Sequence, residues 1–162
     1  MEIDIFTKFD IKMDIMRIEE ILSTKIFDIE NMHNPFVNSA FIEILILLRD
    51  LMAKCEKYSS RISFKDDIII QSDIYDVTCL IKYVRDALCH IDSDNHLTTS
   101  GSKNTLNKGY GKTHIVTIGN IRIMSDYDDE TCFCFGEQKI YFKRHIVRAF
   151  DEAKQKLFPL IS

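Results

Sequence analysis

Apolar residues recur at intervals of three and four over three stretches in the first ninety residues. This spacing predicts amphipathic helices over about 8–27, 35–58 and 73–91. The apolar positions expected on these helices are Phe9, Met13, Met16, Ile18, Ile21 and Leu22 in the first; Phe36, Phe41, Ile44, Leu45, Leu48, Leu51 and Met52 in the second; and Val77, Leu80, Ile81, Val84, Leu88 and Ile91 in the third.

Polar residues mark where the second and third helices begin. Asn34 is placed to cap the second helix, with Pro35 at its first helical position. Asp73 precedes the third helix, and its carboxylate can accept hydrogen bonds from the first backbone N–H groups.

The pattern changes after residue 92. Residues 93–112 are rich in Ser, Thr, Asn and Gly, which predicts a long exposed loop. Short β-branched and aromatic runs then alternate with the turn signals Gly119-Asn120 and Gly136-Glu137, so we expect β-hairpins. The runs are 114–118, 121–124, 131–135 and 139–142, and a closing helix over 143–158 should end before Pro159.

These elements predict a mainly α fold in a single domain spanning residues 1–162. A helical core over about 8–92 is followed by the polar loop 93–112, and by a small C-terminal antiparallel sheet and a closing helix over 113–162. A chain of this length is large enough to bury a substantial core.

The charge distribution is uneven along the chain. The net charge of −4 argues against nonspecific coating of nucleic acid. The first thirty residues are acidic, whereas 101–125 contain Lys and Arg but no Asp or Glu. A local basic surface in the second half therefore stays compatible with the overall acidity.

The cysteines and the N-terminus bear on location. Five cysteines are an odd number, and the acidic N-terminus lacks the apolar segment of a secretory leader. We therefore expect a cytoplasmic protein with reduced thiols. The apolar run 41–48 is too short to span a bilayer, and Glu43 interrupts it, so no membrane association is expected.

The segment Arg85-Asp86-Ala87-Leu88-Cys89-His90 carries the strongest chemical signal. Asp86 and His90 are four residues apart, which places them ~40° apart around a helix and predicts a carboxylate–imidazole hydrogen bond. Arg85 and His90 are five apart and would point ~140° apart on a straight helix. They converge only if the helix ends near His90 or if a dimer axis brings two copies together.

These residue types suit metal-independent cleavage of RNA. A neutral imidazole can take the proton of a ribose 2′-hydroxyl, and a guanidinium can stabilise the charge that develops on the attacked phosphate. The products would be a 2′,3′-cyclic phosphate and a 5′-hydroxyl. The same three residues at a helix end also serve commonly as a cap, an ion pair and a dipole partner.

The segment 85–90 resembles the signature of the HEPN superfamily, an Arg followed by a polar residue and then by a His near the end of a helix. The resemblance covers about residues 35–96. It implies a helical bundle that forms a homodimer with two signatures facing one cleft. It further implies endoribonuclease activity in toxin–antitoxin or other defence systems, with Arg85 and His90 catalytic and Asp86 orienting them. The strands after residue 112 lie outside the minimal bundle, and some members of the superfamily lack nuclease activity.

Several further residues are candidates for supporting roles. His96 lies in the polar loop and is either a second catalytic or phosphate-contacting group or a plain loop histidine. Glu43 or Asp50 on the second helix is a candidate partner for Arg85, or else a solvent-facing acid. Lys143, Arg144 and Arg148 form a basic face that predicts a weak RNA-backbone contact, or else a solvated helix face.

No metal site or cofactor is expected. Cys132 and Cys134 lie on one face of a predicted strand, but the spacing to His114 and His145 does not match known zinc sites. The sequence also lacks the glycine-rich motifs that bind nucleotide phosphates.

The sequence thus leaves three functions open. The first is a homodimeric endoribonuclease acting on RNA, for example as a growth-arresting effector with a cognate antitoxin. The second is a noncatalytic binding, antitoxin or immunity protein, which the acidic N-terminal third favours. The third is a protein that binds a nucleotide or an oligonucleotide second messenger through Arg85 and His90.

Overall fold

The helices form largely where the apolar spacing predicts them. A computed structural model describes residues 3–90, 92–103 and 105–161, and this part of the chain contains four α-helices and five β-strands. The helices are α1 (Ile5–Ser23), α2 (Val37–Tyr58), α3 (Val77–Cys89) and α4 (Arg148–Ile161), and the strands are β1 (Asn107–Tyr110), β2 (His114–Ile118), β3 (Ile121–Met124), β4 (Thr131–Phe135) and β5 (Gln138–Tyr141).

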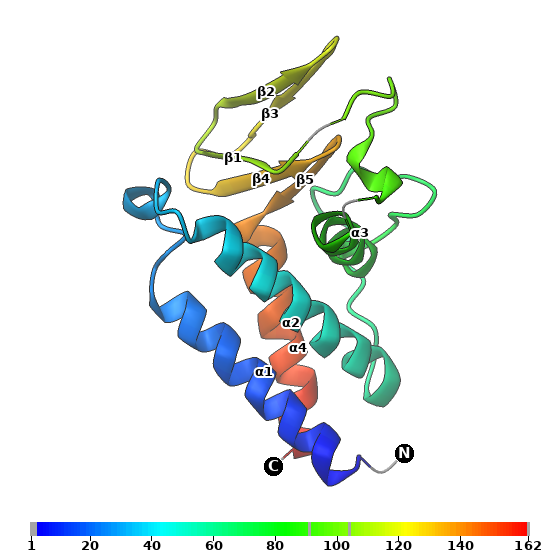
Figure 1. Ribbon diagram of the computed structural model, residues 1–162. Coiled ribbons are helices and arrows are strands. Elements are labelled where there is room, and N and C mark those ends of the chain that lie inside the picture. The colour runs from blue at the N-terminus through cyan, green and yellow to red at the C-terminus, as the bar shows by residue number, and fades with distance from the viewer. Residues whose placement is uncertain (1–2, 91, 104, 162) are drawn as a thin grey trace.

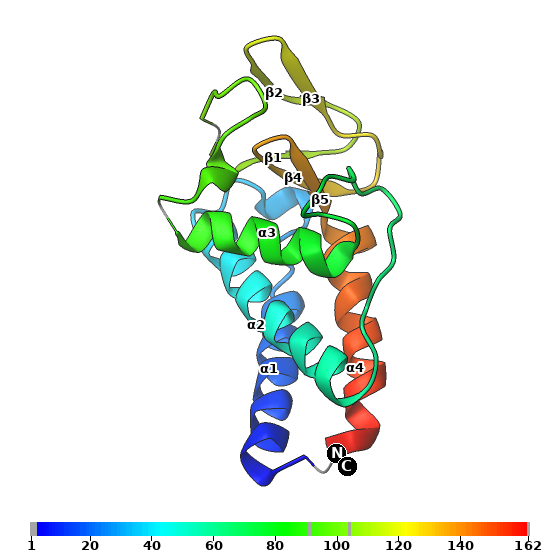
Figure 2. The same ribbon diagram turned by 90° about the vertical axis from the view of Figure 1, so that its right-hand side faces the viewer.

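The long helices α1, α2 and α4 pack side by side, and α3 crosses α2 near one end of this group (Figures 1 and 2). The strands cover that same end of the bundle, while α1 begins and α4 ends at the other end (Figure 1). Since α2 contacts α1, α3 and α4, it is the central helix of the fold.

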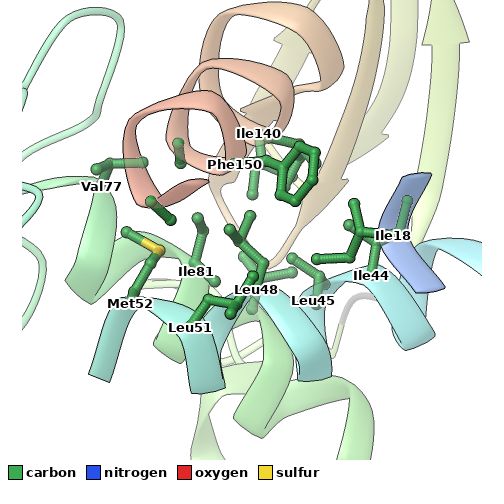
Figure 3. Close-up of a cluster of buried hydrophobic side chains, with 14 of the residues drawn as sticks. Ile18, Ile44, Leu45, Leu48, Leu51, Met52, Val77, Ile81, Ile140 and Phe150 are labelled. Atoms are coloured by element: carbon green, nitrogen blue, oxygen red, sulfur yellow. The ribbon is translucent and has the colours of Figure 1, made fainter. Parts of the chain in front are cut away.

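One hydrophobic cluster joins the helices to the strands. Ile18 of α1, Leu48 of α2 and Phe150 of α4 belong to it, as does Ile140 of β5 (Figure 3). Phe41 of α2 stacks on Phe133 of β4 with ring centroids 3.9 Å apart. The sheet therefore packs on the bundle rather than extending from it as a separate unit.

The strands form two antiparallel units. β1, β4 and β5 make a three-stranded sheet with β4 in the centre, and β2 pairs with β3 in a hairpin. Gly119 and Gly136 adopt positive φ in the two tight turns that the sequence predicts.

The structure corrects the predicted elements in several places. The predicted helices and small antiparallel sheet are confirmed, and together they make a mixed α/β fold. Strand β1 was not predicted, because it forms inside the expected loop 93–112 by pairing with β4. Helix α4 runs through Pro159 to Ile161, since Leu157 and Ile161 bury the same face and offset the missing backbone hydrogen bond. Asp73 does not cap α3.

Some predicted core residues lie on the surface. Phe9, Met13 and Met16 are exposed, because Ile11, Ile15, Ile18 and Ile21 form the buried face of α1 instead. Phe36 is exposed as well, since it precedes the first residue of α2 rather than lying on its buried face. Ile91 lies outside the described residues.

Candidate functional site

Helix α3 is anchored at its N-terminus by Asp76, three residues after the predicted cap. The buried Asp76 carboxylate accepts hydrogen bonds from the backbone N–H of Cys79 at 2.9 Å and from Arg61 Nε at 2.7 Å. Burial alone would raise the pKa of Asp76, but these hydrogen bonds from Arg61 and Cys79 lower it overall. Asp76 is therefore ionised and fixes the start of α3 against the segment that carries Arg61.

The other end of α3 presents His90. The helix ends at Cys89, and His90 leaves it in an extended conformation with φ −124° and ψ 104°. Its backbone N–H still donates to the Asp86 carbonyl at 3.0 Å, and the residue is exposed. Arg85 and His90 can converge within one chain only if the helix ends near His90. The structure meets this condition, because α3 ends at Cys89.

Asp86 forms an ion pair with Arg85, whereas the sequence predicted a hydrogen bond between Asp86 and His90. Arg85 Nη1 donates to Asp86 Oδ1 at 2.7 Å, and both side chains are about three-quarters buried. Among the described residues, Arg85 Nε is buried without a hydrogen-bond partner. The predicted Asp86–His90 hydrogen bond is wrong, since the extended backbone at His90 takes that side chain off the helical face that carries Asp86.

His96 folds back on the turn that follows α3. Its Nε2 lies 3.2 Å from the carbonyl oxygen of His90, and its ring packs edge-on against Phe135 at 4.9 Å. Because a carbonyl only accepts, Nε2 carries the proton in this contact. The structure therefore gives His96 a supporting position behind the backbone of His90.

The β4–β5 turn supports the same loop. Tyr83 Oη donates to the Asn95 carbonyl at 3.0 Å, and Asn95 Nδ2 donates to the Tyr83 carbonyl at 3.2 Å. Glu137 accepts hydrogen bonds from the backbone and hydroxyl of Thr99, both at 2.6 Å. At Gly136 an added Cβ would lie 3.2 Å from the Asn95 carbonyl oxygen, so turn and loop approach closely.

A polar groove runs along the outer face of α3. It consists of two adjoining pockets of about 280 and 430 Å³ that share Tyr75, Cys79 and Lys82. The first pocket adds Arg49 and Arg61 from the α2 side, and the second reaches Asp86 and Asn95. The groove therefore leads from Arg49 and Arg61 past Lys82 to Asp86. Its lining also includes the acids Glu56 and Asp73, so positive and negative side chains alternate along it.

Sequence reasoning did not single out Arg49, Lys82 or Tyr75. Arg49 Nε is buried, and the described residues offer it no hydrogen-bond partner. The only sequence signal was a basic residue on each of two predicted helices, and the packing angle of α2 on α3 decides that they meet.

The predicted acidic partners of Arg85 lie elsewhere. Glu43 Oε1 accepts from Arg17 Nε of α1 at 2.7 Å, and Asp50 pairs with Lys54. These contacts place both acids on the side of α2 that faces α1, so a supporting role for Glu43 or Asp50 at Arg85 is wrong.

The predicted basic face is engaged within the chain. Arg144 Nε donates to the buried Glu130 at 2.9 Å, and its guanidinium lies 3.6 Å from the ring centroid of Tyr127. Arg148 pairs with Asp66 at 2.9 Å, and Lys143 Nζ donates to the Asp129 carbonyl. These contacts tie the start of α4 and the segment before it to neighbouring loops, and the predicted RNA contact at this face stays a prediction.

Cys132, Cys134 and His145 are buried, and their contacts suit a structural role. Burial raises the pKa of Cys132 to about 12 and that of Cys134 to about 11, so both thiols stay protonated. His145 accepts from the backbone N–H of Tyr141 and donates to the Asp66 carbonyl, which occupies both ring nitrogens. In the described part of the chain, no three His, Cys, Asp or Glu side chains gather as metal ligands would.

No helix within the described ranges has the length and apolar content needed to cross a bilayer. The chain matches no family model, no curated protein and no solved structure.

Proposed function

We propose that this protein is a HEPN-like endoribonuclease that cleaves RNA by attack of the ribose 2′-hydroxyl, without a metal ion. The observation that carries the proposal is the end of α3, where an exposed imidazole follows the Arg85–Asp86 ion pair, and the Asp86 carboxylate lines a groove that also holds Lys82.

Each residue has a distinct part in the proposed reaction. His90 takes the proton of the 2′-hydroxyl as general base. The 2′-oxygen then bonds to phosphorus, and the bond from phosphorus to the 5′-oxygen breaks. Asp86 engages one donor of the Arg85 guanidinium, which leaves other donors of that five-donor group for the nonbridging phosphate oxygens. The 5′-oxygen takes a proton from water or from a second imidazole.

The groove offers a path for the rest of the strand. Lys82 and Arg49 lie where they can contact phosphates upstream or downstream of the cleaved bond, and Tyr75 exposes half its surface to a base. Contacts of this kind bind RNA through its backbone and tolerate many sequences.

The resemblance also motivates proposals about biology. A homodimer, a cytoplasmic location and a role as a toxin or defence effector with a cognate antitoxin all follow from it. They belong to the same proposal as the activity.

The proposal is tested by incubating a 5′-labelled RNA with the protein in EDTA. We expect cleavage products that end in a 2′,3′-cyclic phosphate, and no cleavage where a 2′-deoxyribose replaces the nucleophile. Arg85→Ala and His90→Ala should each lower the rate by about 10²–10⁴-fold. His114→Ala is the matched control, because His114 is exposed on β2 and its ring hydrogen-bonds to the nearby Thr117.

Cleavage that survives both Arg85→Ala and His90→Ala would contradict the assignment. No cleavage by the wild type, combined with a stable complex between the protein and a dedicated protein partner, would favour the noncatalytic binding or immunity protein.

A further inference from the structure

Helix α1 has two apolar faces on opposite sides. Its inner face, Ile11, Ile15, Ile18 and Ile21, is buried against the bundle. Its outer face is the set that we call the outer stripe: Ile5, Phe6, Phe9, Met13 and Met16. Residues of the outer stripe are between 45 and 79 % exposed. At ~100° per residue, Phe9 and Met13 lie roughly opposite Ile11 and Ile18.

Such a stripe is unusual on a surface that meets only water. Phe158 of α4, 57 % exposed, lies across a groove from Met16 and extends the apolar surface beyond α1. Taking about 200 Å² for a large side chain, the outer stripe with Phe158 exposes roughly 700 Å². Apolar patches of this size on soluble proteins mark interaction surfaces.

We infer that the outer stripe is the interface of a homodimer in which two copies of α1 cross antiparallel. The exposed area is close to the ~800 Å² that each partner contributes to a stable protein–protein interface. The inference does not rest on the proposed RNA cleavage.

The charges that flank the outer stripe favour a second copy as the occupant. Lys12 and Glu19 lie seven residues apart on the edge that faces α4, where both line the groove with Phe158 and Glu19 pairs with Lys154. Asp10 and Arg17 lie seven apart on the edge that faces α2, where Arg17 pairs with Glu43. About a two-fold axis each edge meets the same edge in reverse order, so Lys12 faces Glu19 of the other copy and Asp10 faces Arg17 of the other copy.

The same charges disfavour a membrane. From Asp4 to Glu20 the helix carries five acids against three bases, which opposes an anionic lipid surface. A two-fold pair of α1 helices, in contrast, has balanced charges along both edges.

The inferred dimer also sets where the candidate sites lie. α1 and α3 flank α2 on opposite sides in both views (Figures 1 and 2). Dimerisation through α1 therefore places the two Arg85–His90 ends on outward faces. The HEPN resemblance implies a shared cleft, but the reaction proposed above uses Arg85 and His90 of one chain and does not need one.

The test is the mass of the full chain in solution by light scattering after size exclusion. At tens of micromolar we expect twice the 19.0 kDa of one chain. Phe9→Glu and Met13→Glu should each give a monomer with an unchanged circular dichroism spectrum. Phe36→Glu is the matched control, because Phe36 is 68 % exposed at the start of α2, and it should stay dimeric.

The antiparallel arrangement has its own test. Lys12→Glu should weaken the dimer about three- to tenfold, and Lys12→Glu combined with Glu19→Lys should restore it. A wild-type monomer, or a dimer that survives both Phe9→Glu and Met13→Glu, would overturn the interface. A charge-reversed pair that does not restore affinity would overturn the antiparallel arrangement.

Discussion

His96 illustrates how a residue beside the site can act without touching substrate. Its Nε2–H donates to the His90 carbonyl, while its ring rests on Phe135. These two contacts hold the turn from which the His90 side chain projects, so His96 is a positioning residue in the proposed enzyme.

Replacing His96 by Phe should keep the ring packing and remove the hydrogen bond. We expect kcat for a short RNA to fall about tenfold, with KM within twofold and the melting temperature within a few degrees, since one neutral hydrogen bond contributes about 1 kcal/mol. Steady-state kinetics and a thermal melt of the same preparation measure both quantities. An unchanged kcat would remove His96 from the site.

At the scale of the element, the position of α3 depends on the cap and the ion pair at its N-terminus. Asp76 is buried, caps the helix and pairs with Arg61, which also donates to Glu56. The carboxylate therefore joins α3 to the end of α2, and the geometry of the Arg85–His90 end follows from this junction.

Asp76→Ala should lower the free energy of unfolding by about 3 kcal/mol, because it removes a cap and leaves Arg61 with a broken, partly buried ion pair. Asp73→Ala is the control, since Asp73 is exposed and does not cap the helix; we expect a change within about 0.5 kcal/mol. Urea denaturation of the two variants distinguishes them. Equal losses would show that Asp76 is not the anchor.

At the scale of the whole molecule, the contact between α1 and α2 includes a titratable cluster. Asp14 of α1 approaches Lys54 and Asp50 of α2, and Lys54 Nζ lies 3.4 Å from Asp14 Oδ2. Burial raises the pKa of Asp14 to about 6, together with the hydrogen bond that protonated Asp14 donates to Asp50 and the repulsion by the Asp50 carboxylate. The folded chain therefore keeps a proton on Asp14 that the unfolded chain releases near pH 4.

Because the pKa of Asp14 is higher in the folded chain than in the unfolded chain, protonated Asp14 stabilises the fold. This contribution is fully present below about pH 4 and is lost as the pH rises through about 6. We expect the free energy of unfolding to fall by about 1 to 2 kcal/mol between pH 4.5 and pH 7.5 from this group, after allowing for its partial exposure. Asp14→Asn should flatten that dependence in urea titrations at several pH values. A variant with the same slope as the wild type would contradict the role of Asp14.

Much of the architecture was predictable from local patterns. The spacing of Ile44, Leu48 and Met52 predicted α2, and the turns at Gly119 and Gly136 predicted both hairpins, because helical periodicity and positive-φ turns are properties of neighbouring residues. The Arg85–His90 segment was likewise visible as a short run at a helix end.

Tertiary structure decided which surfaces meet. Strand β1 formed only because β4 offered an edge for pairing, and its sequence Asn-Lys-Gly-Tyr has little strand propensity of its own. Arg49 and Lys82 met in one groove through the crossing of α3 over α2. On α1 the sequence contains two apolar stripes, and only packing in three dimensions determines that Ile11 and Ile15 enter the core while Phe9 and Met13 face outward. Local periodicity specifies an element and its faces, whereas the choice of partner for each face depends on contacts between residues far apart in the chain.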